Sequence, residues 1–244
     1  SITLNLASET STPNVDVIGA AVIGIETVIV NATTGTDSNG DTAFGFLANS
    51  ADSVTALNFT GTADVTFTVA ANTLDVVAVA IDASSMTGTA DFTLVQTSNL
   101  LAGSTVTGTL GADVIALGGT LGNTYSGGAG NDSFTGALAV LVATGTDDTS
   151  INGGAGTDTL TLSDTTSTLT DNHFTFISNM ETLALNSTTG ALTLTTGAAF
   201  NAAFASGITI TTGVIAASLA NAVVVNAGLA TVNVAITVDA TTMD

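Results

Sequence analysis

Apolar and polar residues alternate along much of the chain, and this alternation predicts short β-strands. In the run Val65–Val69, every second residue is a large apolar one and the two residues between are threonines. A period of two residues places apolar side chains on one face of a strand, as in a half-buried strand. Clusters of Gly, Asn, Asp and Thr interrupt the pattern at short intervals, and Pro13 is the only proline. The pattern therefore predicts an all-β fold of many short strands.

One short segment has a helical pattern instead. Ala198 to Ala205 is rich in alanine, holds Phe200 and Phe204 four residues apart, and is followed by Gly207. Residues four apart share a helix face, so we expect one or two helical turns that end near the glycine.

The uncharged stretch 207–238 raises the question of a membrane span. Asn221, Asn226 and Asn233 interrupt it, and residues 232–238 alternate apolar with polar or small side chains. Because a membrane-spanning helix needs about 20 predominantly apolar residues, we expect strands here and no membrane span.

A long internal repeat organises the chain. Ile25–Asn31 matches Met180–Asn186 at an offset of 155 residues, and Val79–Met86 resembles Ile236–Met243 at an offset of 157. Two separate matches at nearly one offset indicate a tandem unit. About one and a half copies are present, so we expect an excerpt from, or a processed part of, a longer tandem protein.

Charge narrows the range of functions. The 244 residues include no Lys, Arg or Cys but 20 Asp or Glu, and the formal charge is -20. The chain is still 45% hydrophobic with a mean hydropathy of +0.57, which is too apolar for a disordered acidic segment. Nucleic acid and anionic lipid are bound through basic residues, so neither is an expected partner. Carboxylates without internal cations suit a hard divalent cation instead.

The centre of the chain has a nine-residue period. Gly127–Thr135 and Gly153–Thr161 fit G-G-x-G-x-D-x-U-x, where U is a large apolar residue, at every specified position. Gly108–Ala116 departs only at Thr109. Two further nonamers, 118–126 and 144–152, fit more weakly, and 136–143 is degenerate.

This spacing is suited to calcium. Glycines allow turns with positive φ and inward-pointing carbonyls, and stacked turns bring carboxylates and carbonyls of successive coils together. Calcium takes six to eight such oxygen ligands. An alternative reading, Gly-rich turns without metal, stays open. The predicted calcium-site residues are Gly108, Gly111, Asp113, Asn123, Gly127, Gly128, Gly130, Asp132, Asp147, Asp148, Gly153, Gly154, Gly156 and Asp158.

The nonamer count also predicts which side of the roll each turn occupies. Alternate nonamers should lie on the same side, so we expect Asp113 and the pair Asp147 and Asp148 to lie near Asp132. Asn123 and Asp158 are expected on the opposite side, which should bind fewer ions or none.

Catalysis has little support. His173 is the only histidine, and Lys, Arg and Cys are absent, so we expect a structural histidine and no enzyme. The repeat-related Glu26 and Glu181 are expected to act as conformational residues at turns, with calcium ligation between coils as the alternative. Asp82 and Asp239 are expected to form Asx-turns.

The nonamers resemble the RTX repeat, a calcium-binding β-helix motif. Together with the Ile23–Asn31 and Ile177–Asn186 strands and the turn at Ile81–Gly88, they resemble surface-layer proteins of Gram-negative bacteria, the Caulobacter type among them. The resemblance implies an elongated parallel β-helix or β-roll. It divides the chain into a β-rich module (1–106), an RTX calcium-binding roll (107–162) and a truncated second β-rich module (163–244).

The same resemblance implies type I secretion, calcium-dependent folding outside the cell and self-association into a lattice or filament at the bacterial surface. Any contact with surface glycan or lipopolysaccharide would involve parts outside this chain. The alternative is a repeat or ligand-binding module of a secreted RTX adhesin, since adhesins share the nonamers.

Overall fold

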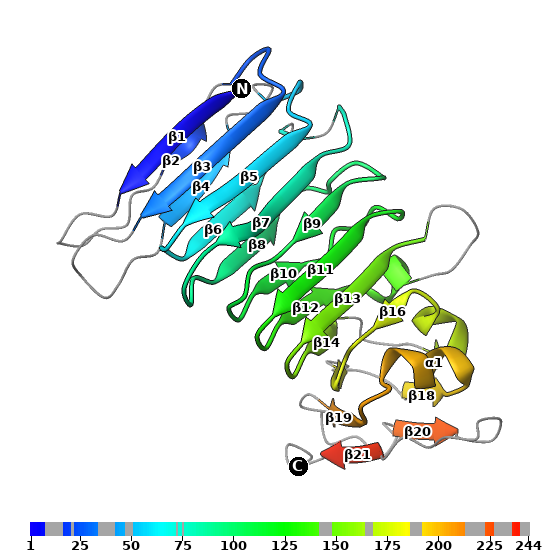
Figure 1. Cartoon of the computed structure of the whole chain (residues 1–244). Helices are drawn as coiled ribbons and strands as arrows, with labels where there is room; N and C mark the ends of the chain where they lie inside the picture. The colour runs from blue at the N-terminus through cyan, green and yellow to red at the C-terminus, as the bar shows by residue number, and fades with distance from the viewer. Residues whose placement is uncertain are drawn as a thin grey trace.

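The computed structural model describes residues 1–7, 17–20, 22–33, 42–46, 51–71, 73–74, 76–141, 148–163, 168–185, 192–212, 223–226 and 236–239. The fold is a parallel β-solenoid, which confirms the predicted all-β class (Figure 1). The coils stack on one another along the axis, and the strand pairings among the described residues are parallel.

Two long sheets and one short sheet make up the solenoid. The first sheet contains, in spatial order, β1 (Ile2–Ala7), β3 (Thr27–Thr33), β5 (Ala56–Gly61), β7 (Ala80–Met86), β9 (Thr105–Thr107), β11 (Thr124–Ala129), β13 (Ser150–Ala155) and β16 (Ile177–Ser178). The second sheet contains β2 (Val17–Ala20), β4 (Thr42–Phe46), β6 (Val65–Val69), β8 (Phe92–Gln96), β10 (Val114–Ala116), β12 (Ser133–Gly136), β14 (Thr159–Leu162), β17 (Thr182–Leu185), β19 (Ile208–Thr212) and β21 (Ile236–Asp239). The short sheet contains β15 (Thr168–Leu169), β18 (Leu192–Thr195) and β20 (Val223–Asn226).

The core lies between the two long sheets and consists of stacked columns of apolar side chains. In β6, Val65, Phe67 and Val69 are buried while the threonines between them are half-buried, so the predicted alternation is confirmed. Parallel pairing places like residues above one another. The central buried column of the second sheet runs through Phe44, Phe67, Leu94, Ile115, Phe134, Leu160, Leu183 and Ile210.

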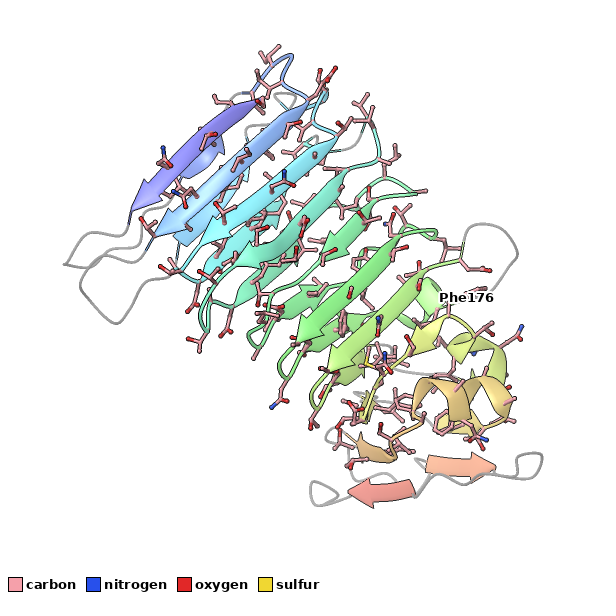
Figure 2. All side chains as sticks on the ribbon, viewed as in Figure 1. Phe176 is labelled. Atoms are coloured by element: carbon pink, nitrogen blue, oxygen red, sulfur yellow. The ribbon has the colours of Figure 1, made fainter. Side chains whose placement is uncertain are left out.

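The outer faces carry mainly Thr, Ser, Ala and Asn side chains, drawn as sticks in Figure 2. Phe176, labelled there, is an exception, since it precedes β16 and is 43% exposed. Its backbone carbonyl still accepts the N–H of Ile151 at 2.9 Å, so the segment remains attached to the preceding coil.

The predicted helix is present as α1 (Ala198–Ala203), and two short 3-10 helices, η1 (Leu138–Leu141) and η2 (Asp171–Phe174), accompany it. Phe174 of η2 packs against Phe200 and Phe204, with ring centroids 5.0 and 5.8 Å away. The Asp171 carboxylate accepts the N–H of Phe200 at 2.9 Å, which satisfies a free donor of the first turn of α1.

Strands occupy the described parts of the uncharged stretch 207–238, namely β19, β20 and the start of β21. Within the described ranges, no helix has the length and apolar character needed to cross a membrane.

Corresponding strands of the two copies of the internal repeat lie in opposite sheets. Thr27 of the first copy stacks through Ala56 on Ala80, all in the first sheet. Their counterparts Thr182, Thr209 and Thr237 stack in the same order in the second sheet. The backbone agrees, since the carbonyl of Glu26 accepts the N–H of Ala56 and that of Glu181 accepts the N–H of Thr209. The second copy therefore repeats the first after a half-integral number of coils.

Both long sheets run without a break through the expected module boundaries. β9 itself spans residues 105–107 and pairs with β7 on one side and β11 on the other. β14 pairs with β17 across residue 162.

Candidate cation-binding site

A column of three buried aspartates and one half-buried glutamate lines the turn from the first sheet to the second. Strand register stacks Asp113, Asp132, Asp158 and Glu181 in four consecutive coils. The three aspartates are at most 1% exposed. The equivalent positions in the flanking coils are the buried apolar residues Phe92 and Ile208. We call these four acids the acid column.

A ladder of hydrogen bonds connects the acid column to the backbone. Oδ1 of Asp113 accepts the N–H of Phe92 at 2.6 Å. Oδ1 of Asp132 accepts the N–H of Asp113 at 2.8 Å, and Oδ1 of Asp158 accepts the N–H of Asp132 at 2.8 Å. Oε2 of Glu181 accepts the N–H of Asp158, also at 2.8 Å. Each carboxylate therefore ties its own coil to the coil before it.

The second carboxylate oxygens of Asp132 and Asp158 have a different environment. Oδ2 of each is buried and accepts no hydrogen bond. A buried charged oxygen without a partner is costly, and native proteins satisfy nearly all such groups with a hydrogen bond, a water or an ion. These two oxygens are free to bind a cation.

The first glycine of each complete nonamer lets two oxygen atoms approach the backbone closely. A Cβ placed on Gly127 would overlap Oδ2 of Asp132 and crowd the carbonyl oxygen of Gly153. A Cβ placed on Gly153 would overlap the carbonyl oxygen of Asn179 and crowd Oδ2 of Asp158. At each of these glycines, a carboxylate oxygen of one coil and a carbonyl oxygen of the next therefore approach the same point, and we call this arrangement a cradle.

Backbone conformation also supports the second cradle. Asn179 has φ 53, which makes it the one non-glycine residue in the left-handed region among the described residues. Asparagine tolerates this region better than most residues. Its amide Nδ2 donates to Oδ1 of Asn152 at 2.7 Å, an interaction that fixes the residue whose carbonyl faces Gly153.

The electrostatics of the column favour a positive partner. Burial raises the pKa of Asp113 to about 6 and that of Asp132 to about 7, and burial also raises the pKa of Asp158. The charges of Asp113 and Asp158 add to the rise for the pKa of Asp132. Stacked coils are about 4.8 Å apart, and the chain has no Lys or Arg. Protons or a bound cation are thus the available means of neutralising these carboxylates.

The opposite turn, from the second sheet to the first, carries a neutral column. Here Ser104, Asn123 and Thr149 stack and are buried. Oγ of Ser104 accepts the N–H of Val79 at 3.0 Å, and Oδ1 of Asn123 accepts the N–H of Ser104 at 3.1 Å. Asn123 therefore lies away from the acid column, on the side where few or no ions were expected.

The predicted placement of Asp158 is wrong, because it stacks directly on Asp132. The cause lies between β12, which ends at Gly136, and β13, which begins at Ser150 in the other sheet. β12 and β13 lie in opposite sheets, whereas the nonamer count placed them in the same sheet. Asp148 therefore precedes β13 on the side of Asn123, and not near Asp132. Asp147 lies outside the described residues.

The remaining predicted glycines allow close stacking of the turns. Gly130 and Gly156 have positive φ, and a Cβ on either would overlap the carbonyl of the glycine below, Gly111 or Gly130. Gly128 and Gly154 also have positive φ and face a carbonyl in the same way. These glycines permit the approach of one coil to the next that brings the cradle oxygens together.

The column extends beyond the nonamers to Glu181, for which the repeat predicted a turn position with calcium ligation between coils as the alternative. Glu181 follows the last nonamer, yet it occupies the aspartate position of its coil. Asp64 and Asp91 form a second ladder beside the column, since the N–H of Asp91 donates to Asp64 at 2.9 Å and that of Ala112 to Asp91 at 2.7 Å. The signal available in the sequence was their position along the chain, because each of these acids immediately precedes a strand of the second sheet.

Several other predicted residues have structural partners. Oδ1 of Asp82 accepts the N–H of Ser84 at 2.9 Å, the bond of an Asx-turn. The side chain of Asp239 is outside the described part. Nδ1 of His173 accepts the N–H of Thr170 at 2.9 Å at the start of η2. Glu26 is exposed and contributes its backbone carbonyl to the stacking.

In the described ranges, no group of three or more Asp, Glu, His or Cys side chains is arranged to hold a metal ion by itself. A cation in the acid column must therefore combine carboxylate oxygens with backbone carbonyl oxygens, a mixture that calcium accepts. The site and fold define a parallel β-solenoid with a buried acid column. No family model, curated protein or solved structure matches the chain.

Proposed function

We propose that the acid column binds calcium and that the chain is a calcium-dependent structural segment of a bacterial cell surface. The observation that carries the proposal is the pair of buried, unpartnered Oδ2 atoms of Asp132 and Asp158, each beside a cradle with a carbonyl oxygen. The first ligands would come from Asp132 with the Gly153 carbonyl, and from Asp158 with the Asn179 carbonyl.

Calcium suits this donor set better than magnesium does. Calcium accepts carboxylate and carbonyl oxygens in flexible arrangements of six to eight ligands. Magnesium needs near-ideal octahedral geometry and keeps several of its waters. Two stacked turns offer carbonyls at positions set by the coil spacing, which favours the larger and less demanding ion.

The cation would act as a folding ligand. A charge of -20 destabilises a compact state through self-repulsion. In a solenoid each coil contacts chiefly its neighbours, so stability is close to a sum of nearest-neighbour terms. An ion bound between two coils would strengthen the interaction between those neighbouring coils. It would also offset the repulsion between buried like charges that otherwise weakens their stacking.

The surface role is supported by architecture and by the resemblance to RTX surface-layer proteins. The outer faces of the strands carry mostly small, uncharged side chains. A rigid, elongated, metal-stabilised solenoid with such faces suits a mechanical and protective layer outside the cell, where calcium is abundant. Assembly would follow calcium binding.

A calcium titration of the full chain, stripped with EDTA, tests the proposal. Far-UV circular dichroism follows folding, equilibrium dialysis counts ions, and light scattering with negative-stain microscopy follows assembly. We expect a cooperative gain of β signal, bound calcium and then ordered arrays, with magnesium at equal concentration as the control. Folding without arrays would move the function to an adhesin module, and a folded protein that binds no calcium would refute the metal site.

A further inference from the structure

Of the three nonamers in the acid column, the first already satisfies its carboxylate. Oδ2 of Asp113 accepts the N–H of Thr109 at 2.6 Å. Oδ1 accepts the hydroxyl of Thr109 at 2.8 Å as well as the N–H of Phe92. Asp113 thus accepts three hydrogen bonds, whereas Oδ2 of Asp132 and of Asp158 accepts none.

The difference arises from one position of the motif. Thr109 occupies the place of Gly128 and Gly154 in the two complete nonamers. Those glycines have φ of +110 and +111, a conformation strongly disfavoured for a β-branched residue. Thr109 does not adopt a positive φ, so its turn follows a different path. On that path both its N–H and its hydroxyl reach the Asp113 carboxylate.

Further bonds hold this arrangement in place. The Thr109 hydroxyl oxygen accepts the N–H of Gly111 at 2.9 Å, so it is fixed while it donates to Asp113. The next residue, Ala112, donates its N–H to Asp91 in the preceding coil at 2.7 Å. The turn is therefore held by its own side chain and by the coil before it.

The cradle beside Gly108 would bind a cation only weakly. This cradle resembles the other two, since a Cβ on Gly108 would overlap Oδ2 of Asp113 and the carbonyl oxygen of Gly127. An N–H group, however, points at the carboxylate oxygen that would bind the ion. Hydrogen bonds to a carboxylate are about twice as strong as neutral ones, and an entering cation would have to break them and face the N–H dipole.

We propose that Thr109 excludes calcium from the first nonamer, so that the cation-binding part of the column begins at Asp132. This inference rests on the proposed calcium site and departs from the prediction that Asp113 and Gly108 belong to it. Along the solenoid, the column position changes from apolar residues (Val65 and Phe92), through the hydrogen-bonded Asp113, to the open Asp132 and Asp158.

The test counts calcium ions per full-length chain by equilibrium dialysis at pH 7.5, with circular dichroism to confirm folding. Thr109→Gly restores the complete motif and is expected to bind one ion more than the unmodified chain. Thr107→Gly, in the adjacent strand with its side chain on the outer face, is the matched control and should leave the count unchanged.

A second pair of variants keeps the inference testable if Thr109→Gly folds poorly. Asp113→Asn should bind as many ions as the unmodified chain, whereas Asp132→Asn should bind fewer. An unchanged count in a folded Thr109→Gly chain, or a loss of an ion in Asp113→Asn, would overturn the exclusion by Thr109. An unmodified chain that binds no calcium would overturn the proposed function itself and this inference with it.

Discussion

The backbone N–H of Asp132 donates to Oδ1 of Asp158, one coil further along the solenoid, at 2.8 Å. The same carboxylate leaves Oδ2 buried and without a hydrogen-bond partner. One oxygen therefore connects the coils while the other is available to an ion. Because the two oxygens of one side chain have these different surroundings, a substitution can separate the proposed metal binding from coil stacking.

Replacing Asp132 by Asn should have opposite effects with and without calcium. Asparagine keeps a carbonyl oxygen for the N–H of Asp113 but removes a buried charge, so the calcium-free chain should become more stable near pH 8. Calcium at about 100 times its dissociation constant stabilises a fold by about 2.7 kcal/mol per site, and the variant should lose that gain at this site. Urea denaturation in EDTA and in calcium measures both effects.

Asp82→Asn provides the control for this experiment, because Asp82 lies on the outer face and caps an Asx-turn. Its stabilisation by calcium should equal that of the unmodified chain. Equal calcium stabilisation in the Asp132 variant would contradict a role for this carboxylate in ion binding.

The stability of the calcium-free chain should fall as pH rises from about 4 to about 7. The pKa values of Asp113 and Asp132 rise in the folded state from 3.8 to about 6 and about 7. The folded state therefore binds more protons than the unfolded state in this range, and stability decreases with pH. Chemical denaturation in EDTA at pH 5 and pH 8 checks the sign, and a flat or rising profile would refute it.

Calcium should suppress this pH dependence. An ion that replaces protons on the column makes the folded state bind fewer of them, so added calcium should stabilise the chain more at pH 8 than at pH 5. Proton release on calcium addition, measured in two buffers of different ionisation enthalpy by calorimetry, provides a second readout.

Gly127→Ala should remove a calcium site and destabilise the fold. Gly127 has no positive φ, so the backbone tolerates alanine, but the new methyl group would overlap Oδ2 of Asp132. Overpacking of this kind costs about 1–3 kcal/mol. Gly45→Ala is the matched control, since the nearest atom to its Cβ would be the Thr68 carbonyl oxygen at 3.5 Å, an ordinary contact. The number of calcium ions bound per chain and the melting temperature, measured for both variants, test this prediction.

Glu181→Ala should destabilise the calcium-free chain by about 1–3 kcal/mol, the usual cost of leaving a buried group without its hydrogen-bond partner. The lost bond is the one from the N–H of Asp158, whose hydrogen exchange should accelerate. Glu26→Ala is the control offered by the repeat, because Glu26 is exposed and stacks through its backbone. Similar effects of both substitutions would show that the Glu181 carboxylate has no special role.

The fold followed from local patterns, but the arrangement of the site depended on stacking. Alternation in Val65–Val69 and the Gly-rich turns at Gly127 and Gly153 were sufficient to predict strands and coils. The side of Asp158 was not predictable from a nine-residue count, because β12 and β13 lie in opposite sheets, where two nonamer steps would have placed them in the same one. Segment length alone does not say whether extra residues form a new half-coil or enlarge an existing turn.

The place of Glu181 in the acid column and the hydrogen bonds of Thr109 were not predicted, for a related reason. Glu181 lies outside the motif in sequence and joins the column only because β17 pairs in register with β14. Thr109 was recognised as a departure from the motif, yet its effect depends on the direction of one N–H group. A pattern records which residue type is present and leaves out where its backbone donors point.

The exchange of sheets between the two repeat copies has a consequence for lateral contacts. If the copies were related by a whole number of coils, a given row of side chains would recur on the same face of the solenoid. Here the row that begins at Thr27 in one sheet begins again at Thr182 in the other, so related rows face opposite neighbours. A solenoid built in this way has related rows of side chains on two opposite faces, so it can make comparable contacts with a neighbour on each side, as the members of a flat ribbon must.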